Sequence, residues 1–229
     1  MTKQTIFFIT VIFSLGIIGI NVVNGAPKPF SVANVHFEQN ATDGDMEVVF
    51  QAQGGSEGLE KLTVVSPDGS TIIDFKAPES STLGIRQFRF ESPEPGDTES
   101  LKSGYPEGEY SFSGATPSGN MFEGKSTLRH KLPATTRFLT PEEDAEDVEI
   151  NGLVITWTPV KDIAAYQVYI ELSEPELSLT VRLPGSATQF VVPDGFLLPG
   201  YEYQLGIGTI AEDGNASFVE TSFTTAGDE

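Results

Sequence analysis

The chain of 229 residues contains no cysteine. This absence excludes disulfide bonds, zinc–thiolate sites, lipid attachment through an N-terminal cysteine and catalysis by a thiol. Any folded domain must therefore be stabilised by its hydrophobic core. Apolar residues make up 38% of the chain, which is enough for two small domains with cores of their own.

Basic residues are scarce as well. Lysine and arginine number 13 against 33 aspartates and glutamates, which gives a formal net charge of -20. Nucleic acids and anionic membrane surfaces would be repelled by this charge, so we do not expect them as partners. The charge is consistent with solubility alone, or with a protein that meets cations.

Only two histidines occur, and they lie far apart in the sequence. His36 stands between Val35 and Phe37 in an alternating run, so it should point outward if its neighbours point inward. His130 lies near the end of the first predicted domain. One histidine in each of two distant segments forms neither a metal cluster nor a proton relay, and we expect no function for either.

The N-terminus has the order of a secretory signal. Lys3 supplies a positive charge, residues 6–20 are almost wholly apolar, and small and polar residues follow up to Gly25. Cleavage after Gly25 would leave Ala26 as the first residue of a secreted or periplasmic protein. The alternative is an uncleaved anchor, because residues 6–23 approach the length that spans a bilayer.

Period-two alternation then predicts an all-β fold. The chain has 23 glycines and 15 prolines, many of them in turn signals between short alternating runs. Seven or so such runs within residues 29–133 predict an immunoglobulin-like β-sandwich. Residues 92–104, which are acidic and rich in proline and glycine, predict a loop. The runs are 32–38, 46–51, 59–66, 70–76, 85–91, 110–115 and 122–128.

Three turn motifs lie between the predicted strands of this first domain. They are Asp43-Gly44-Asp45, Ser66-Pro67-Asp68-Gly69, and the corner Pro106-Glu107-Gly108-Glu109-Tyr110. Together they loosely resemble an uncharacterised N-terminal module of bacterial secreted proteins. That resemblance implies no chemistry.

The second half of the chain has a sharper pattern. Trp157, the only tryptophan, ends one apolar run, and a Leu-Leu-Pro-Gly-Tyr-Glu-Tyr corner spans residues 197–203. Residues 141–149 hold six acids, and repulsion between like charges predicts a solvated loop there. The alternating runs are 153–158, 165–171, 177–183, 188–192, 204–211 and 217–225.

These motifs resemble a fibronectin type III domain over residues 134–225. The resemblance rests on Trp157 in the second strand, Tyr166 in the third, and Leu197-x-Pro199-Gly200-x-x-Tyr203 before the sixth. The resemblance implies a second sandwich in tandem with the first, and a binding or spacer module rather than an enzyme. No Arg-Gly-Asp occurs before the last strand, so an integrin-type contact is not implied. We expect Tyr203 to be structural.

Two segments match the residue spacing of catalytic motifs but not the secondary structure that those motifs need. Residues 119–126 fit the phosphate loop G-x-x-x-x-G-K-S, but the segment after Lys125 alternates like a strand, where a phosphate loop needs a helix. Residues 54–58 fit G-x-S-x-G around Ser56, yet a strand pattern follows there too. We interpret the first as a glycine-rich hairpin with an exposed Lys125 and the second as a loop.

Calcium is the one ion for which candidate ligands exist. The acids between Glu142 and Glu149, Asp43 with Asp45, and Glu212 with Asp213 supply hard oxygens, without the spacing of a calcium-binding loop. A solvated acidic surface is the default interpretation, and the metal site stays undetermined.

Two weaker patterns remain. Aromatic side chains that can reach the surface are Tyr169, Tyr201 and Phe218, although sheet-face packing explains them equally. The sequences at Asn40 and Asn215 fit the glycosylation acceptor pattern, which has meaning only in a eukaryotic host.

The sequence therefore predicts an exported, non-enzymatic binding or spacer protein of two β-sandwiches, with no catalytic residue and no cofactor. Its partner, a protein or cell-surface component, is not identified by any motif. The alternatives are a membrane-anchored structural protein of the envelope and an accessory module of an extracellular hydrolase.

Overall fold

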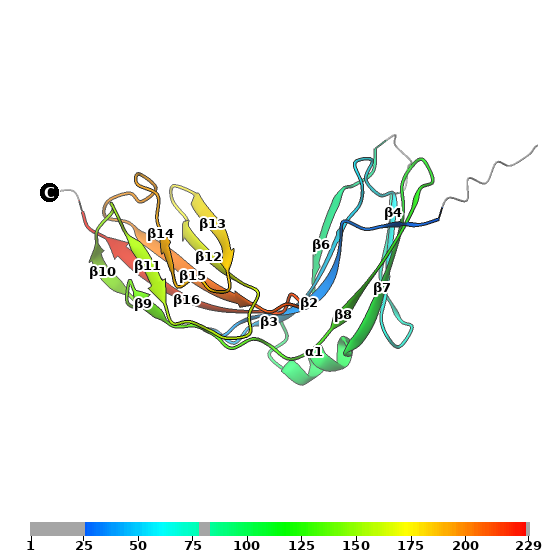
Figure 1. Ribbon diagram of the computed structural model, residues 1–229, viewed down its shortest axis with the longest axis horizontal. Coiled ribbons are helices and arrows are strands. Elements are labelled where there is room, and N and C mark those ends of the chain that lie inside the picture. Colours follow the sequence, from blue (N-terminus) through cyan, green and yellow to red (C-terminus); the bar gives the residue numbers. More distant parts are fainter. Residues whose placement is uncertain (1–25, 78–82, 228–229) are drawn as a thin grey trace, which may run out of the picture.

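A computed structural model describes residues 26–77 and 83–227, and it contains two β-sandwiches arranged as a V (Figure 1). The predicted all-β fold is confirmed: the helix α1 (Thr98–Gly104) is the single helix in the described ranges. The predicted signal peptide and its cleavage site after Gly25 lie outside the described residues.

The N-terminal sandwich packs a five-stranded sheet against three further strands. The order of the five-stranded sheet is β1-β8-β7-β4-β5, and β2, β3 and β6 pair in that order opposite it. The strands are β1 (Lys28–Pro29), β2 (Val32–Asn40), β3 (Met46–Gln53), β4 (Lys61–Val65), β5 (Thr71–Lys76), β6 (Gln87–Glu91), β7 (Gly108–Ala115) and β8 (Met121–Leu128).

Alternation explains this sandwich and its core. Val35 and Phe37 on β2 are fully buried, as are Val64 on β4 and Tyr110 on β7. The Tyr110 hydroxyl donates a hydrogen bond to the carbonyl of Pro106 at 3.1 Å. The Pro-x-Gly-x-Tyr motif therefore forms a tyrosine corner that fixes the entry into β7.

The C-terminal sandwich packs three strands against four. The smaller sheet has the order β14-β11-β9, and the larger has the order β13-β12-β15-β16. The strands are β9 (Phe138–Thr140), β10 (Ala145–Val148), β11 (Val154–Trp157), β12 (Ala165–Leu172), β13 (Leu177–Pro184), β14 (Gln189–Val191), β15 (Glu202–Ile210) and β16 (Ala216–Thr225).

The residues that carry the sequence resemblance lie in the core of this second sandwich. Trp157 and Tyr166 are buried, with ring centroids 5.2 Å apart. Tyr203 is also buried, and its hydroxyl accepts a hydrogen bond from the backbone N–H of Leu198 at 2.8 Å. The second corner is thus built like the first.

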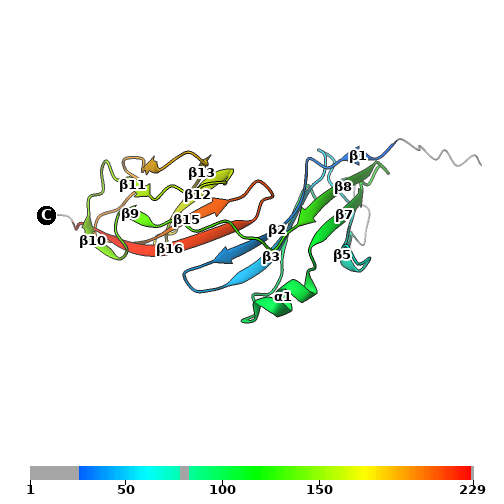
Figure 2. The ribbon, with the colours of Figure 1, turned by 60° about the horizontal axis from the view of Figure 1, so that its bottom comes forward.

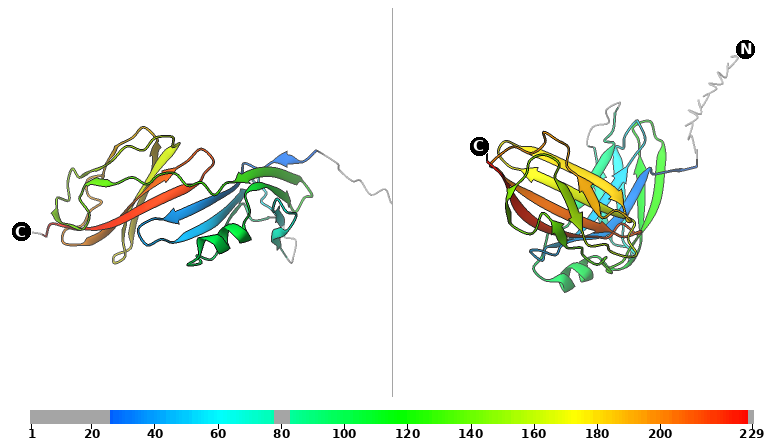
Figure 3. Two further views of the ribbon diagram at one scale, coloured as in Figure 1. Left: turned by 90° about the horizontal axis from the view of Figure 1, so that it is seen from below. Right: turned by 60° about the vertical axis from the view of Figure 1, so that its left-hand side comes forward.

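One sheet runs through both sandwiches. Strand β16 pairs in parallel with β2, with Ala216 opposite Glu38 and Phe218 opposite Asn40. Figure 2 shows β16 (red) beside β2 (blue), and the resulting strand path is β13-β12-β15-β16-β2-β3-β6. The described chain begins at the far end of one sandwich and ends at the far end of the other (Figure 3).

Two predicted loops contain regular structure. Residues 98–104 form α1, because Asp97 caps its N-terminus and the buried side chain of Leu101 anchors it. Residues 145–148 form β10, which pairs in parallel with β16. Its acids Glu146 and Asp147 point into solvent, so like-charge repulsion does not prevent the strand from forming.

Candidate functional site

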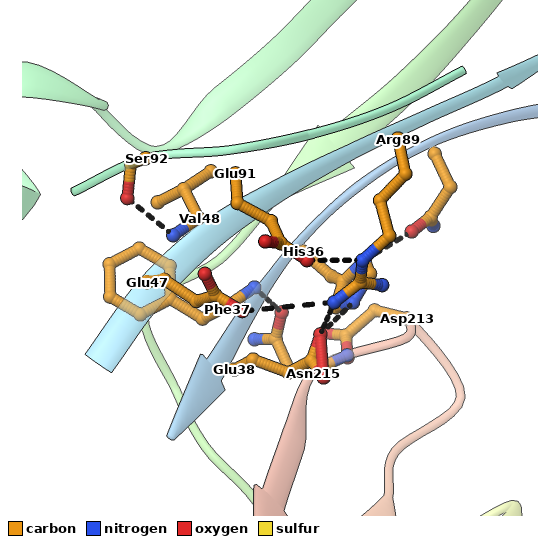
Figure 4. A network of polar contacts seen from close by, with 11 residues as sticks. His36, Phe37, Glu38, Glu47, Val48, Arg89, Glu91, Ser92, Asp213 and Asn215 are labelled. Carbon is orange, nitrogen blue, oxygen red and sulfur yellow. Dashed lines mark hydrogen bonds and ion pairs between the residues drawn. The ribbon is translucent and has the colours of Figure 1, made fainter. Parts of the chain in front are cut away.

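The joint between the sandwiches is organised by Asn215, at the start of β16 (Figure 4). Its side-chain oxygen accepts a hydrogen bond from the N–H of Phe37 at 2.8 Å. Its amide nitrogen donates to the carbonyls of Arg129 and Lys131 at 2.7 and 2.9 Å. Asn215 is 1% exposed, so it cannot accept a glycan, contrary to the sequence pattern.

Further hydrogen bonds join the two sandwiches along the same line. Ser217 is fully buried, and its hydroxyl donates to the Pro133 carbonyl and accepts from Gln39, both at 2.8 Å. Thr209 donates to the carbonyl of Ala134 at 2.8 Å. The linker is therefore docked along the second sandwich, because buried polar groups of that sandwich depend on its carbonyls.

His36 lies beside this joint and faces away from the first core, as predicted. It is nevertheless only 7% exposed, because the turn at Gly214 lies against it. Its ring nitrogens contact Asn34 at 2.6 Å and Glu38 at 3.1 Å. The Nε2 of His130 contacts the carbonyl of Tyr105 at 2.8 Å, and its ring packs on Phe37. Both histidines thus have structural contacts at the joint.

A charged network continues from His36 across the sheet (Figure 4). Arg89 pairs with Glu38 at 3.1 Å, with Glu47 at 3.7 Å, and also with Glu91. Burial, together with the negative charges of Glu91 and Glu38, raises the pKa of Glu47 to about 7. Burial alone would raise the pKa of Glu38, but the hydrogen bond to His36 and the charge of Arg89 lower it.

Two aromatic rings lie on the outer face of the second sandwich. Tyr169 covers Gly206, and Phe218 covers Gly208. A Cβ at either glycine would lie within 2.4 Å of ring atoms, so only glycine permits this packing. The ring centroids are 6.2 Å apart, and the Tyr169 hydroxyl donates to Glu220. Tyr201, the third predicted surface aromatic, lies elsewhere and is 39% exposed.

Two cavities open on this face and share Glu220. The smaller, of about 250 Å³, lies between the sandwiches, and its lining includes Glu38 and Glu47 with Tyr169 and Phe218. The larger, of about 970 Å³, runs over the ends of β12, β13, β15 and β16. Its carboxylates are Glu143, Asp144, Glu171, Glu176, Glu202 and Glu220.

The calcium candidates are only partly brought together. Asp45 lines the smaller cavity, whereas Glu143 and Asp144 line the larger. Asp213 lies apart, where it pairs with Arg129 at 3.7 Å. In residues 26–77 and 83–227, no three histidine, aspartate or glutamate side chains are grouped so that they could hold a metal ion.

The two segments that match catalytic motifs, residues 119–126 and 54–58, have the conformations predicted for them. Residues 121–126 of the phosphate-loop match belong to β8, and Lys125 pairs with Glu109 at 2.6 Å. Ser56 lies in a turn that leads to the bridge at Leu59 and to β4, with no helix after it. Neither segment has the strand–turn–helix geometry that its chemistry requires.

The sequence did not indicate Glu220 or Asn215 as important residues. Each depends on a contact between segments about 180 positions apart, such as Asn40 with Glu220 and Phe37 with Asn215. One local signal did exist. The alternation Gly206-x-Gly208 inside a strand is typical of a place where other groups approach the backbone closely.

Comparisons with known proteins found no family and structures of low similarity. No protein-family model matches the chain. Fibronectin(III)-like modules of Clostridium thermocellum CbhA are 11% identical over 86% of this chain and 92% of theirs, with a TM-score of 0.36. A two-domain fibronectin type III segment of chicken tenascin is 16% identical over 87% and 99%, with a TM-score of 0.33.

A third structure, the FN1–FN3 domains of chicken CNTN1, is 13% identical over 88% of this chain and 67% of that one, with a TM-score of 0.32. The fold assignment rests on the strand pairing described above. In the described part of the chain, no helix is long and apolar enough to cross a membrane.

Proposed function

We propose that this chain is an exported, non-enzymatic protein that acts as a binding or spacer module. The observation that carries the proposal is the joint at β16 and β2, where strand pairing and the buried Asn215 hold two sandwiches together. A joint of this kind suits a protein that presents surfaces in a fixed relation. Residues 29–133 and 134–225 would be the two domains.

Export is the first part of the proposal to test. Mass spectrometry of the protein from its native cells should give a mature N-terminus at Ala26. A chain that retains residues 6–23 would support the alternative, a membrane-anchored envelope protein.

Binding is the second part. Immobilised mature chain should retain a reproducible partner from the native cell surface or medium, and a chain with the same charge but an unrelated fold should not. Repeated failure to retain any partner would leave only the spacer role.

The remaining alternative, an accessory module of a hydrolase, has its own test. A broad hydrolase screen should show no turnover by the purified chain. Activity that fell on Ser56→Ala or on Glu220→Gln would contradict the proposal.

A further inference from the structure

The outer face of the four-stranded sheet in the second sandwich carries exposed side chains, among them Glu171, Ser178 and Gln204. The larger groove crosses it and meets the smaller cavity at Glu220. Side chains that point outward from β12 and β16 form its floor, whereas the alternate residues face the core.

All the charged side chains that line the larger groove are negative. Six carboxylates line it, and no lysine, arginine or histidine does. Within the described ranges, none of the six is in an ion pair, whereas Glu38 and Glu47 of the smaller cavity are already paired with Arg89. Among the described residues, the carboxylates of this groove therefore have no positively charged partner, although Glu220 accepts hydrogen bonds from Tyr169 and Asn40.

The aromatic pair of Tyr169 and Phe218 also favours a positively charged ligand. The negative faces of aromatic rings attract ammonium and guanidinium groups, and arginine most often. Tyr169 and Phe218 line the smaller cavity, which meets this groove at Glu220, and both half-buried rings lie against glycines. A cation placed at this end of the groove would lie close to the carboxylate of Glu220 and to the Tyr169 ring, whose hydroxyl donates to that carboxylate.

We infer that this groove binds a basic, extended segment of a partner protein. The inference rests on the proposed binding function and names the class of its partner. Charge complementarity selects a cationic ligand and steers it to the face. An extended segment fits because basic residues at alternate positions would all point to the same face, toward the carboxylates.

The test uses a short peptide of alternating arginine and serine, and its counterpart with citrulline in place of arginine. Binding to the mature chain is measured by fluorescence anisotropy near physiological salt. The groove variant is Glu171→Gln with Glu202→Gln. The control variant is Asp74→Asn with Glu123→Gln, which removes two exposed charges from the first sandwich.

None of these four side chains makes a hydrogen bond or ion pair in the described part of the chain, so both variants should fold. We expect the groove variant to weaken binding of the arginine peptide about fivefold or more, and the control variant by less than about twofold. Phe218→Leu should weaken it about two- to fivefold. The citrulline peptide should not bind.

Equal weakening by the groove and control variants would overturn the inference, because net charge alone would then attract the peptide. Binding of the citrulline peptide, or no binding of either peptide, would overturn it too. The broader proposal is tested separately. A native partner that the groove variant retains as well as the unchanged chain does would leave the binding function standing and reject this groove as its site.

Discussion

The Tyr203 hydroxyl accepts a hydrogen bond from the N–H of Leu198 at 2.8 Å, and the Tyr203 side chain is fully buried whereas Leu198 is half-buried. In Tyr203→Phe this N–H loses its partner, which costs about 1 kcal/mol of unfolding free energy. Trp157 is the only tryptophan and lies in the same core, so its fluorescence reports unfolding of this sandwich. Denaturant titration should show a lower midpoint.

The matched control is Tyr110→Phe in the first sandwich. It removes the donor to the Pro106 carbonyl, so an acceptor rather than an N–H is left unpaired there. The tryptophan transition should move less than in Tyr203→Phe. An unchanged midpoint in Tyr203→Phe would mean that the corner hydrogen bond does not stabilise the domain.

Glu47 makes stability depend on pH. Its pKa is about 7 in the folded protein against an ordinary value of 4.5, so the folded state binds the proton more tightly. Its contribution therefore increases as pH falls through 7 and is complete below 4.5. After allowance for partial solvent exposure, the unfolding free energy should rise by about 1 kcal/mol between pH 8 and pH 5.

The control for this effect is Glu47→Gln, which cannot titrate. The difference in unfolding free energy between the two proteins should shrink as pH falls from 8 to 5, because other groups cancel in the comparison. A pH-independent difference would contradict the raised pKa. The lowered pKa of Glu38 acts in the opposite direction and weakens the fold only toward lower pH.

Single residues differed in how well the sequence predicted them. The spacing of Trp157, Tyr166 and Tyr203 placed all three correctly in one core, because alternation and turn motifs are local signals. The outward direction of His36 was predicted, but its burial, like that of Asn215, was not. Alternation tells which face a side chain takes, but it does not tell which distant segment covers that face.

Helix α1 should depend on its cap. The Asp97 side chain accepts hydrogen bonds from the N–H of Glu99 at 3.0 Å and from the hydroxyl of Ser100 at 2.7 Å. Asp97→Ala should destabilise the helix because the cap is lost, whereas Asp97→Asn should retain the cap. Hydrogen exchange at the amides of Leu101 and Tyr105 should become faster in the alanine variant only.

Helix α1 and strand β10 also show why element prediction failed in these places. Both segments are short, and each is fixed by a few apolar contacts: Leu101 in the helix, and Ala145 with Val148 in the strand. A bulge separates Ala145 from Val148 in the pairing with β16, so strict alternation is lost. The longer strands, with unbroken alternation, were predicted well.

The two sandwiches should behave as one rigid body because their joint is a buried polar network within a continuous sheet. Asn215 is its centre, and Asn215→Ala leaves the N–H of Phe37 and two carbonyls without their partner. We expect this variant to lose about 2–3 kcal/mol of unfolding free energy and to loosen the joint.

The absence of native cysteine makes the joint measurable, since labels can be attached at chosen sites. Spin labels on Asp74→Cys and Thr180→Cys, both exposed, report the distance between the sandwiches. The distribution should be narrow in the parent chain and broader in Asn215→Ala. It should stay narrow in Arg129→Gln, which removes only the exposed pair with Asp213. A parent distribution as broad as that of Asn215→Ala would mean that the paired strands do not fix the angle of the V, and the spacer role would lose its basis.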